Sequence, residues 1–280
     1  MINFIKYSRL YALISIVTIL LGFFAMMRFG LKLSIDFTGG SVVSYTFRKP
    51  QAEDAIRQVF KKEKVDIIEM SRKKDTEALV RTKPMNEKQE VDIRASLSAT
   101  LKRFDSVGPS LGQETVRKTA IASLAGIIGI LLYVSFTFKR FNYGIAAIVA
   151  LLHDICVLIG TYAILGMLGA EFDALFITAL LTTMSFSVHD TIVVFDKIRE
   201  YRKTSGLSIT DIANRSLTET IVRSLNNSLT IVLMLVPLTF IGGESLRFFA
   251  AALLIGTITG TYSSPFIATP LLVFFEKRRK

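Results

Sequence analysis

The sequence has a single cysteine and only two histidines, which excludes two common ways of stabilising a small fold. One thiol, Cys156, cannot form an internal disulfide, and its place inside an apolar run predicts inert packing. Cysteine and histidine form no cluster anywhere in the chain, so a structural zinc site is not expected. We expect neither a metal nor a cofactor.

Long apolar runs are abundant. Hydrophobic residues make up 51% of the chain and the mean hydropathy is +0.47, which favours a membrane protein. Five runs could form helices of about 20 residues that cross the bilayer, and a sixth qualifies if one aspartate is tolerated. The six predicted spans are 10–29, 119–138, 143–168, 174–195, 221–241 and 246–275. The first run ends without a cleavage site, which favours an uncleaved helix over a secretory signal.

The charges of the loops predict the orientation. Basic residues lie ahead of the first run, at Lys139 and Arg140, in the loop 196–220 and in the C-terminal tail. The short loops 169–174 and 242–245 are acidic or neutral. Six spans place every basic segment, and both termini, in the cytoplasm. The net charge of +11 therefore indicates topology rather than nucleic-acid binding, although the tail and the 196–220 loop could also contact anionic lipids, ribosomes or a cytosolic partner.

The segment 31–118 is more polar and predicts a small domain on the outer side of the membrane. Its predicted strands are 42–47, 65–70 and 77–82 with an extended piece at 104–112, and its predicted helices are 52–62 and 86–104, the latter with Val91, Leu97 and Leu101 on its apolar side. The order β-α-β-β-α-β is that of the α+β ferredoxin-like fold. The predicted domains are thus 1–30, with the first transmembrane helix, the extracytoplasmic domain 31–118, and 119–280, with transmembrane helices two to six.

A glycine turn is predicted where the first helix gives way to the first strand. Asp36, Gly39 and Gly40 belong to the stretch DFTGGS, and glycine permits a tight backbone path. The stretch lacks the spacing and the lysine of a phosphate-binding loop.

Asp190 lies inside the fourth predicted span. A carboxylate in a span is costly, so it usually faces a partner or a water-filled path. Two polar helix faces are predicted to meet, one of Thr183, Ser187 and Asp190 and the other of Arg223, Asn226, Asn227 and Thr230. Asp190 would lie about 24 Å along its span, near the depth of Arg223. Periodicity alone fits a proton relay, a fixed salt bridge, or an arginine that reaches lipid headgroups.

His153 and Asp154 form a second polar spot, near the middle of the third span. The pair fits either an internal helix contact or an extension of a proton path through Asp190. His189 immediately precedes Asp190, and one position along a helix turns its side chain about 100° away from that of Asp190.

The sixth span carries Gly256, Gly260 and Ser264 on one face. Small residues at this spacing predict close helix packing. Pro265 and Pro270 predict a kink or a tilt in the same span.

Several motifs carry a resemblance to a known family. They include IDFTGGS after the first span, SVGPSLG before the second, SFSVHDTIVVFDKIRE across the fourth and FIGGESLRFF before the sixth. In order and length they resemble the SecD/SecF family of protein-export membrane proteins, within the resistance-nodulation-division superfamily.

The resemblance implies a non-enzymatic subunit of the bacterial cytoplasmic membrane. Such a subunit would form a heteromeric complex with SecD and use the proton-motive force to help unfolded polypeptides through the SecYEG channel. It implies that Asp190 and Arg223 are the proton-path residues. Two residues depart from the family pattern, His189 in place of asparagine and Ser34 in place of a frequent glycine. A small-solute or lipid transporter subunit, a passive scaffold, and sodium as the coupling ion remain alternatives.

Overall fold

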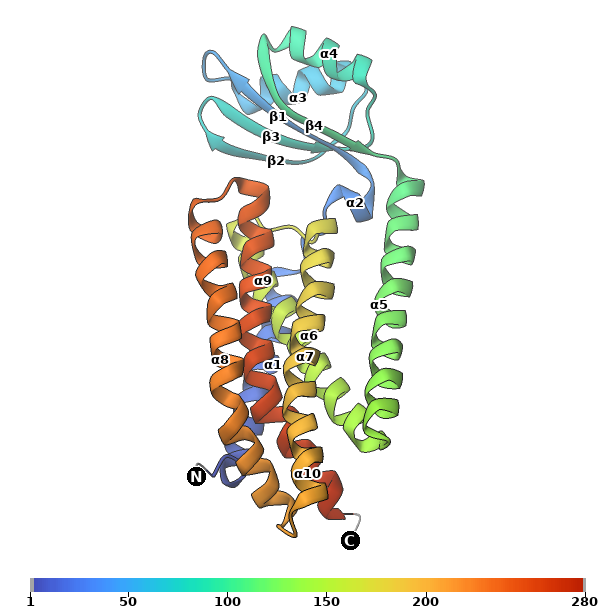
Figure 1. Cartoon of the computed structure of the whole chain (residues 1–280). Coiled ribbons are helices and arrows are strands. Elements are labelled where there is room, and N and C mark those ends of the chain that lie inside the picture. Colours follow the sequence, from blue (N-terminus) through green and yellow to red (C-terminus); the bar gives the residue numbers. More distant parts are fainter. Residues whose placement is uncertain (1–2, 279–280) are drawn as a thin grey trace. The chain divides into compact units, whose positions relative to one another are not determined.

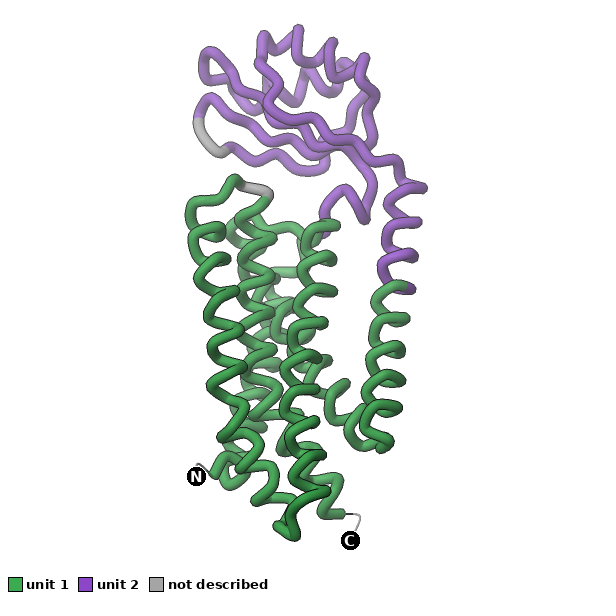
Figure 2. Tube along the Cα trace, in the orientation of Figure 1, with its two compact units in different colours: residues 1–32, 122–280 green, residues 33–121 purple. Residues whose placement is uncertain are grey.

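The computed structural model describes residues 3–278, apart from the side chains at 73–74 and 244–245. The last two basic residues of the tail and the acidic side chain of the 242–245 loop therefore lie outside the described part. The chain forms two compact units: one of residues up to Lys32 together with Ala122 onward, and one of Leu33–Ile121 (Figure 2). Each unit is described by itself.

Six helices in the described residues are long and apolar enough to cross a membrane. They are α1 (Ser8–Phe29), α5 (Pro109–Phe138), α6 (Phe141–Leu165), α7 (Ala174–Thr204), α8 (Ile209–Ile241), and α9 (Glu244–Ser263), which continues through a π-helical segment (Ser264–Ala268) into α10 (Thr269–Arg278) (Figure 1). The predicted six-helix fold class is confirmed. The kink predicted from the two prolines takes the form of the π-helical segment.

The helices extend beyond the predicted apolar runs because local signals set their ends. Asp173 caps α7, where its Oδ1 accepts a hydrogen bond of 2.7 Å from the Phe176 amide. Ser208 caps α8 in the same way through the amide of Asp211. A proline at the first position, where its missing N–H costs nothing, opens α5 at Pro109.

Close contacts of small residues hold α1 against α6, which lie side by side in Figure 1. A Cβ atom on Gly160 would lie 2.4 Å from the Cα of Gly22, so the two backbones meet directly. Cys156 lies one turn before Gly160 with its side chain exposed. The predicted inert packing of this thiol within a span stays a prediction.

Ion pairs fix the end of α10 to the helices beside it. Glu276 is buried and accepts hydrogen bonds from Arg140 Nη1 at 3.1 Å and from Arg202 Nη1 at 2.5 Å. Asn142 donates to the same carboxylate at 3.3 Å. One acidic side chain thus joins the last helix to the beginning of α6 and the end of α7.

The second unit is built on one antiparallel sheet. Its strands are β1 (Gly40–Phe47), β2 (Ile67–Lys74), β3 (Glu77–Thr82) and β4 (Ala99–Val107), in the order β2-β3-β1-β4. The helices α3 (Glu53–Lys62) and α4 (Glu87–Ser96) cover one face of it (Figure 1). The predicted ferredoxin-like arrangement is confirmed.

The core of this unit lies between the sheet and its two helices. Ile56 and Phe60 of α3, Ile93 of α4 and Tyr45 of β1 are fully buried there. Tyr45 donates a hydrogen bond of 3.4 Å to the buried carboxylate of Glu90. Burial first, and then the charge of Glu90, raise the pKa of the Tyr45 hydroxyl.

The helix predicted at 86–104 is too long. A capping box of Asn86 and Gln89 starts α4, but the chain turns at Ser98, where φ is +46°. The next residues form β4 and pair with β1. Tertiary pairing therefore overrides the helical pattern, and Val91 is exposed where the prediction buried it. The extended piece predicted at 104–112 is confirmed as far as Val107, where β4 ends, and is wrong beyond it, because α5 begins at Pro109.

The glycine turn brings the motif IDFTGGS into contact with the motif SVGPSLG. After the single helical turn α2 (Ile35–Thr38), in which the Asp36 amide donates to Ser34 Oγ, Gly39 and Gly40 have φ of +71° and +122°. A Cβ atom on Gly39 would lie 2.9 Å from the Cα of Pro109. Both glycines are therefore required by conformation, and Gly39 also by close packing.

Candidate functional site

The predicted polar face of α7 is buried against α9. Thr183, Ser187 and Asp190 are at most 7% exposed. A Cβ atom on Gly256 would lie 2.3 Å from Thr183 Cγ2, and one on Gly260 would lie 3.0 Å from Ser187 Cβ. The small-residue face of α9 thus brings its backbone onto the polar face of α7.

Ser264 completes this contact at the π-helical segment. Its Oγ lies 2.8 Å from Thr191 Oγ1 and donates to the backbone carbonyl of Ser187 at 3.3 Å. The π-helical backbone leaves some N–H and C=O groups without their usual helical partners. Because the segment lies inside the helix bundle, other protein groups can hydrogen-bond to them. Sequence reasoning assigned Ser264 to packing alone and missed Thr191.

Asp190 faces α8. Its carboxylate lies near the Ser224 hydroxyl, and His189 and Arg223 are basic neighbours of it. Within the described part of the chain, no ion pair joins Asp190 to Arg223. A small cavity of about 10 Å³ lies beside Asp190, lined also by Ser187 and Asn227, and a polar space of this size holds about one water.

The face that α8 turns to its neighbours differs from the predicted one. Its buried polar residues are Asn214, Ser216, Thr220, Ser224 and Ser228. All four residues of the predicted face are exposed, and of these Asn227 also lines the small cavity. Small hydroxyl side chains allow close helix approach, and a guanidinium does not. A serine or threonine at every fourth position was the sequence signal for this face.

Asp154, on α6, lies at the centre of a hydrogen-bond network. Ser187 of α7 and Ser263 of α9 each donate to Asp154 Oδ2 at 2.6 Å. His153 Nδ1 lies 3.0 Å from Asp154 Oδ1. All four side chains are at most 7% exposed. The structure therefore brings both predicted residues of the third span together with Ser187, and Ser263 is a member that sequence reasoning missed.

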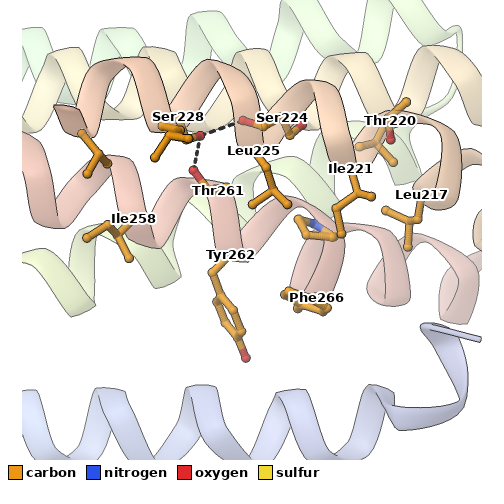
Figure 3. Close-up of a pocket in the computed structure, with 14 residues that line it drawn as sticks. Leu217, Thr220, Ile221, Ser224, Leu225, Ser228, Ile258, Thr261, Tyr262 and Phe266 are labelled. Atoms are coloured by element: carbon orange, nitrogen blue, oxygen red, sulfur yellow. Dashed lines mark hydrogen bonds between the residues drawn. The ribbon is translucent and has the colours of Figure 1, made fainter. Parts of the chain in front are cut away.

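A larger cavity of about 440 Å³ is lined mainly by residues of α8 and α9, Ser224 among them (Figure 3). Its walls are mostly apolar, with Leu217, Ile221, Leu225, Ile258 and Phe266 among them. The hydroxyls that reach it are engaged in hydrogen bonds, as the dashed lines from Ser228 to Ser224 and Thr261 illustrate. Its described lining holds no charged side chain. The cavity therefore offers little to a polar solute.

No group of three or more histidine, cysteine, aspartate or glutamate side chains suited to a metal ion occurs among residues 3–278 with described side chains. The site consists of two buried carboxylates, a histidine and hydroxyls, and these groups come together from α6, α7, α8 and α9.

Comparison with known proteins relates these features to one family. The family described as protein export membrane protein SecD/SecF, C-terminal, matches residues 87–278, and the SecD/SecF GG motif matches residues 24–51. The chain belongs to the SecD/SecF family. The GG motif of that family is the turn at Gly39 and Gly40, and the C-terminal match includes both buried carboxylates.

The chain matches several SecF and SecDF proteins over almost its full length. The chain is 38% identical to protein translocase subunit SecF of Thermobaculum terrenum, over 99% of this chain and 95% of that one. It is 37% identical to subunit SecF of Anaerolinea thermophila, over 99% and 94%. Protein translocase subunit SecDF of Thermus thermophilus is 36% identical over 90% of this chain, which covers 35% of the longer protein.

Solved structures of SecDF agree with this fold. A crystal structure described as a translocon-associated membrane protein from Thermus thermophilus superposes with a TM-score of 0.82 at 32% identity, over 99% of this chain. A super-membrane-facing form gives a TM-score of 0.71. In both cases the chain spans 39% of the SecDF chain. The molecule is thus a multi-pass membrane protein whose fold corresponds to one part of SecDF.

Proposed function

We propose that this chain is a subunit of a protein translocase and couples proton movement across the membrane to the export of polypeptides. Asp190 takes up and releases the proton, and Arg223 supplies the charge that responds to it. The family membership and the translocase relatives support the role in translocation. The state of Asp190 supports the proton step.

The observation that carries this proposal is a buried carboxylate that forms no ion pair among the described residues and lies near a hydroxyl. Asp190 is 7% exposed and lies near Ser224, while Arg223 is exposed on the same helix as Ser224. A fixed ion pair would keep the carboxylate charged. A hydroxyl can accept or donate, so it accommodates either charge state of Asp190. Arginine stays charged throughout, and only its distance from Asp190 can change.

The partners follow from the relatives. Because related SecDF proteins contain a corresponding part within a longer chain, we propose that a separate SecD chain assembles with this one. The SecYEG channel and the unfolded polypeptide that it exports would be the further partners. Both termini would lie in the cytoplasm, where the basic loops also lie. The chain acts on no substrate bond in this proposal and is not an enzyme.

Export into membrane vesicles that contain SecD and SecYEG tests the proposal. Asp190→Asn and Arg223→Met should each abolish the gradient-dependent part of export and leave assembly with SecD intact. Asp196→Asn is the matched control, since this aspartate lies on the same helix but is exposed and paired with Arg199. Full gradient-dependent export in both site variants would refute the proton step and favour a passive scaffold. Replacing the proton gradient by a sodium gradient identifies the coupling ion.

A further inference from the structure

The hydrogen-bond network at Asp154 is a second buried acid that the proposed path through Asp190 and Arg223 does not use. Its three partners come from α6, α7 and α9, at 2.6–3.0 Å. A purely structural contact needs only one such bond, and an apolar core would hold the helices without the cost of burying a charge. Three donors converging on one carboxylate indicate that its charge matters.

The pair has room for one more proton. His153 Nδ1 lies against Asp154 Oδ1, but the buried His153 Nε2 has no hydrogen-bond partner among the described residues. A protonated imidazole donates from both nitrogens. A proton added to His153 would be balanced by the Asp154 charge next to it, and its removal would leave a carboxylate held by two serines and by the neutral imidazole.

The same network does not fit a metal cation. A cation of the size of Ca²⁺ or Na⁺ lies about 2.4 Å from each ligand oxygen. The oxygens of Ser187 and Asp154 are only 2.6 Å apart, and so are those of Ser263 and Asp154. Hydroxyls at that distance donate their protons to the carboxylate, so in this arrangement hydrogen bonds rather than a cation occupy Asp154 Oδ2.

Ser187 links this network to Asp190. Its Oγ donates to Asp154, and the same residue lines the small cavity beside Asp190. We propose that the His153–Asp154 pair is a second proton-binding site and that Ser187 passes protons between it and the cavity of Asp190. In the inward step Ser187 gives its hydroxyl proton to Asp154 Oδ2 and receives one from protonated Asp190 through a water in the small cavity. Asp190 then carries the negative charge that Asp154 has lost, and the serine is unchanged.

The groups that face the pair from the neighbouring helices are few. They are Tyr262 on α9, whose ring centroid is 6.1 Å from that of His153 and whose hydroxyl donates to the Tyr11 carbonyl on α1, and, beyond Ser187, Asp190 on α7. In the described part of the chain, His153 is the only basic side chain within ion-pair distance of Asp154. The charge of the pair is therefore set by its own two members and by Asp190.

The inference rests on the proposed function, so its test compares two acids in one assay. In vesicles with SecD and SecYEG, Asp154→Asn and Ser187→Ala should each lower gradient-dependent export by about tenfold or more, the scale of a lost proton-transfer group. Thr178→Ala is the control for the serine, because its exposed hydroxyl bonds only within α7. Loss of export in Asp190→Asn with normal export in Asp154→Asn would overturn this inference alone. Normal export in both would overturn the proposed function as well.

A spectroscopic measurement separates proton binding from a structural role. The chain has two histidines, so His189→Asn leaves one imidazole to observe. In the full chain in nanodiscs, ¹⁵N signals of His153 should pass from neutral to protonated in one titration step. Asp154→Asn should displace that step, and the more conservative Asp154→Glu should restore it. A titration unaffected by Asp154→Asn would show that the network only holds the helices together.

Discussion

Gly256 lies where α9 comes closest to α7. A Cβ atom there would lie 2.3–2.8 Å from three atoms of Thr183, which is nearer than packed atoms can approach. Gly256→Ala should therefore separate the helices and destabilise the fold by about 1–3 kcal/mol, the usual cost of overpacking. Thermal unfolding of the purified protein in detergent measures the change.

Gly126→Ala is the control at the same scale. This glycine also lies in a helix, α5, but a Cβ atom there would have no neighbour within 4 Å. Alanine should leave stability unchanged or raise it by roughly 0.5–1 kcal/mol, since glycine is the poorer helix former. Equal effects of the two substitutions would contradict a packing role for Gly256.

At the scale of a single element, the attachment of α10 to its neighbours depends on one buried carboxylate, that of Glu276. Glu276→Gln removes the charge that binds Arg140 and Arg202. The cost should be roughly 2 kcal/mol, less than for a fully buried pair, because both arginines reach water. Hydrogen exchange should become faster in α10 and stay unchanged in α1.

Lys277→Gln is the matched control for this element. Lys277 is the next residue and is exposed, so its loss should alter neither unfolding nor exchange. If Glu276→Gln behaved like Lys277→Gln, other contacts would hold α10 in place.

Which elements could be predicted depended on the range of the forces that form them. The spans and the strand Glu77–Thr82 were visible because burial in lipid or between two layers imposes a local pattern. The end of α4 was not visible, because Ala99–Val107 joins the sheet through pairing with β1, far away in sequence. The face that α8 turns toward Asp190 could not be predicted either. The polar residues of α8 showed that one of its faces is buried, but packing places Ser224 rather than Arg223 near Asp190.

The site followed the same rule. Asp190, Ser187 and Asp154 could be named as costly polar residues inside apolar runs. Their grouping could not, since the hydrogen bonds of Asp154 join α6 to Ser263, 109 positions away. A pattern along one helix identifies the chemical groups of a site, whereas the partners that set their charge come from helices distant in sequence.

The orientation of the whole molecule in the membrane is a prediction from charge. Basic residues gather at Lys139, at Arg140 and between α7 and α8, and such segments stay in the cytoplasm. The unit Leu33–Ile121 then lies outside, where it can reach an emerging polypeptide. Arrangement and function are linked here, because the reverse orientation would place that unit on the side from which polypeptides leave.

Cysteine labelling tests this orientation, and the single native thiol makes the assay simple. In a Cys156→Ala background, Lys49→Cys places a thiol at an exposed site after β1, and Gly206→Cys places one between α7 and α8, with open space around it. A membrane-impermeant maleimide added to intact cells should label only the first. The second should react only after lysis, because the positive-inside bias keeps that loop in the cytoplasm. The opposite pattern would reverse the topology and remove the basis for placing Asp190 near the cytoplasmic side.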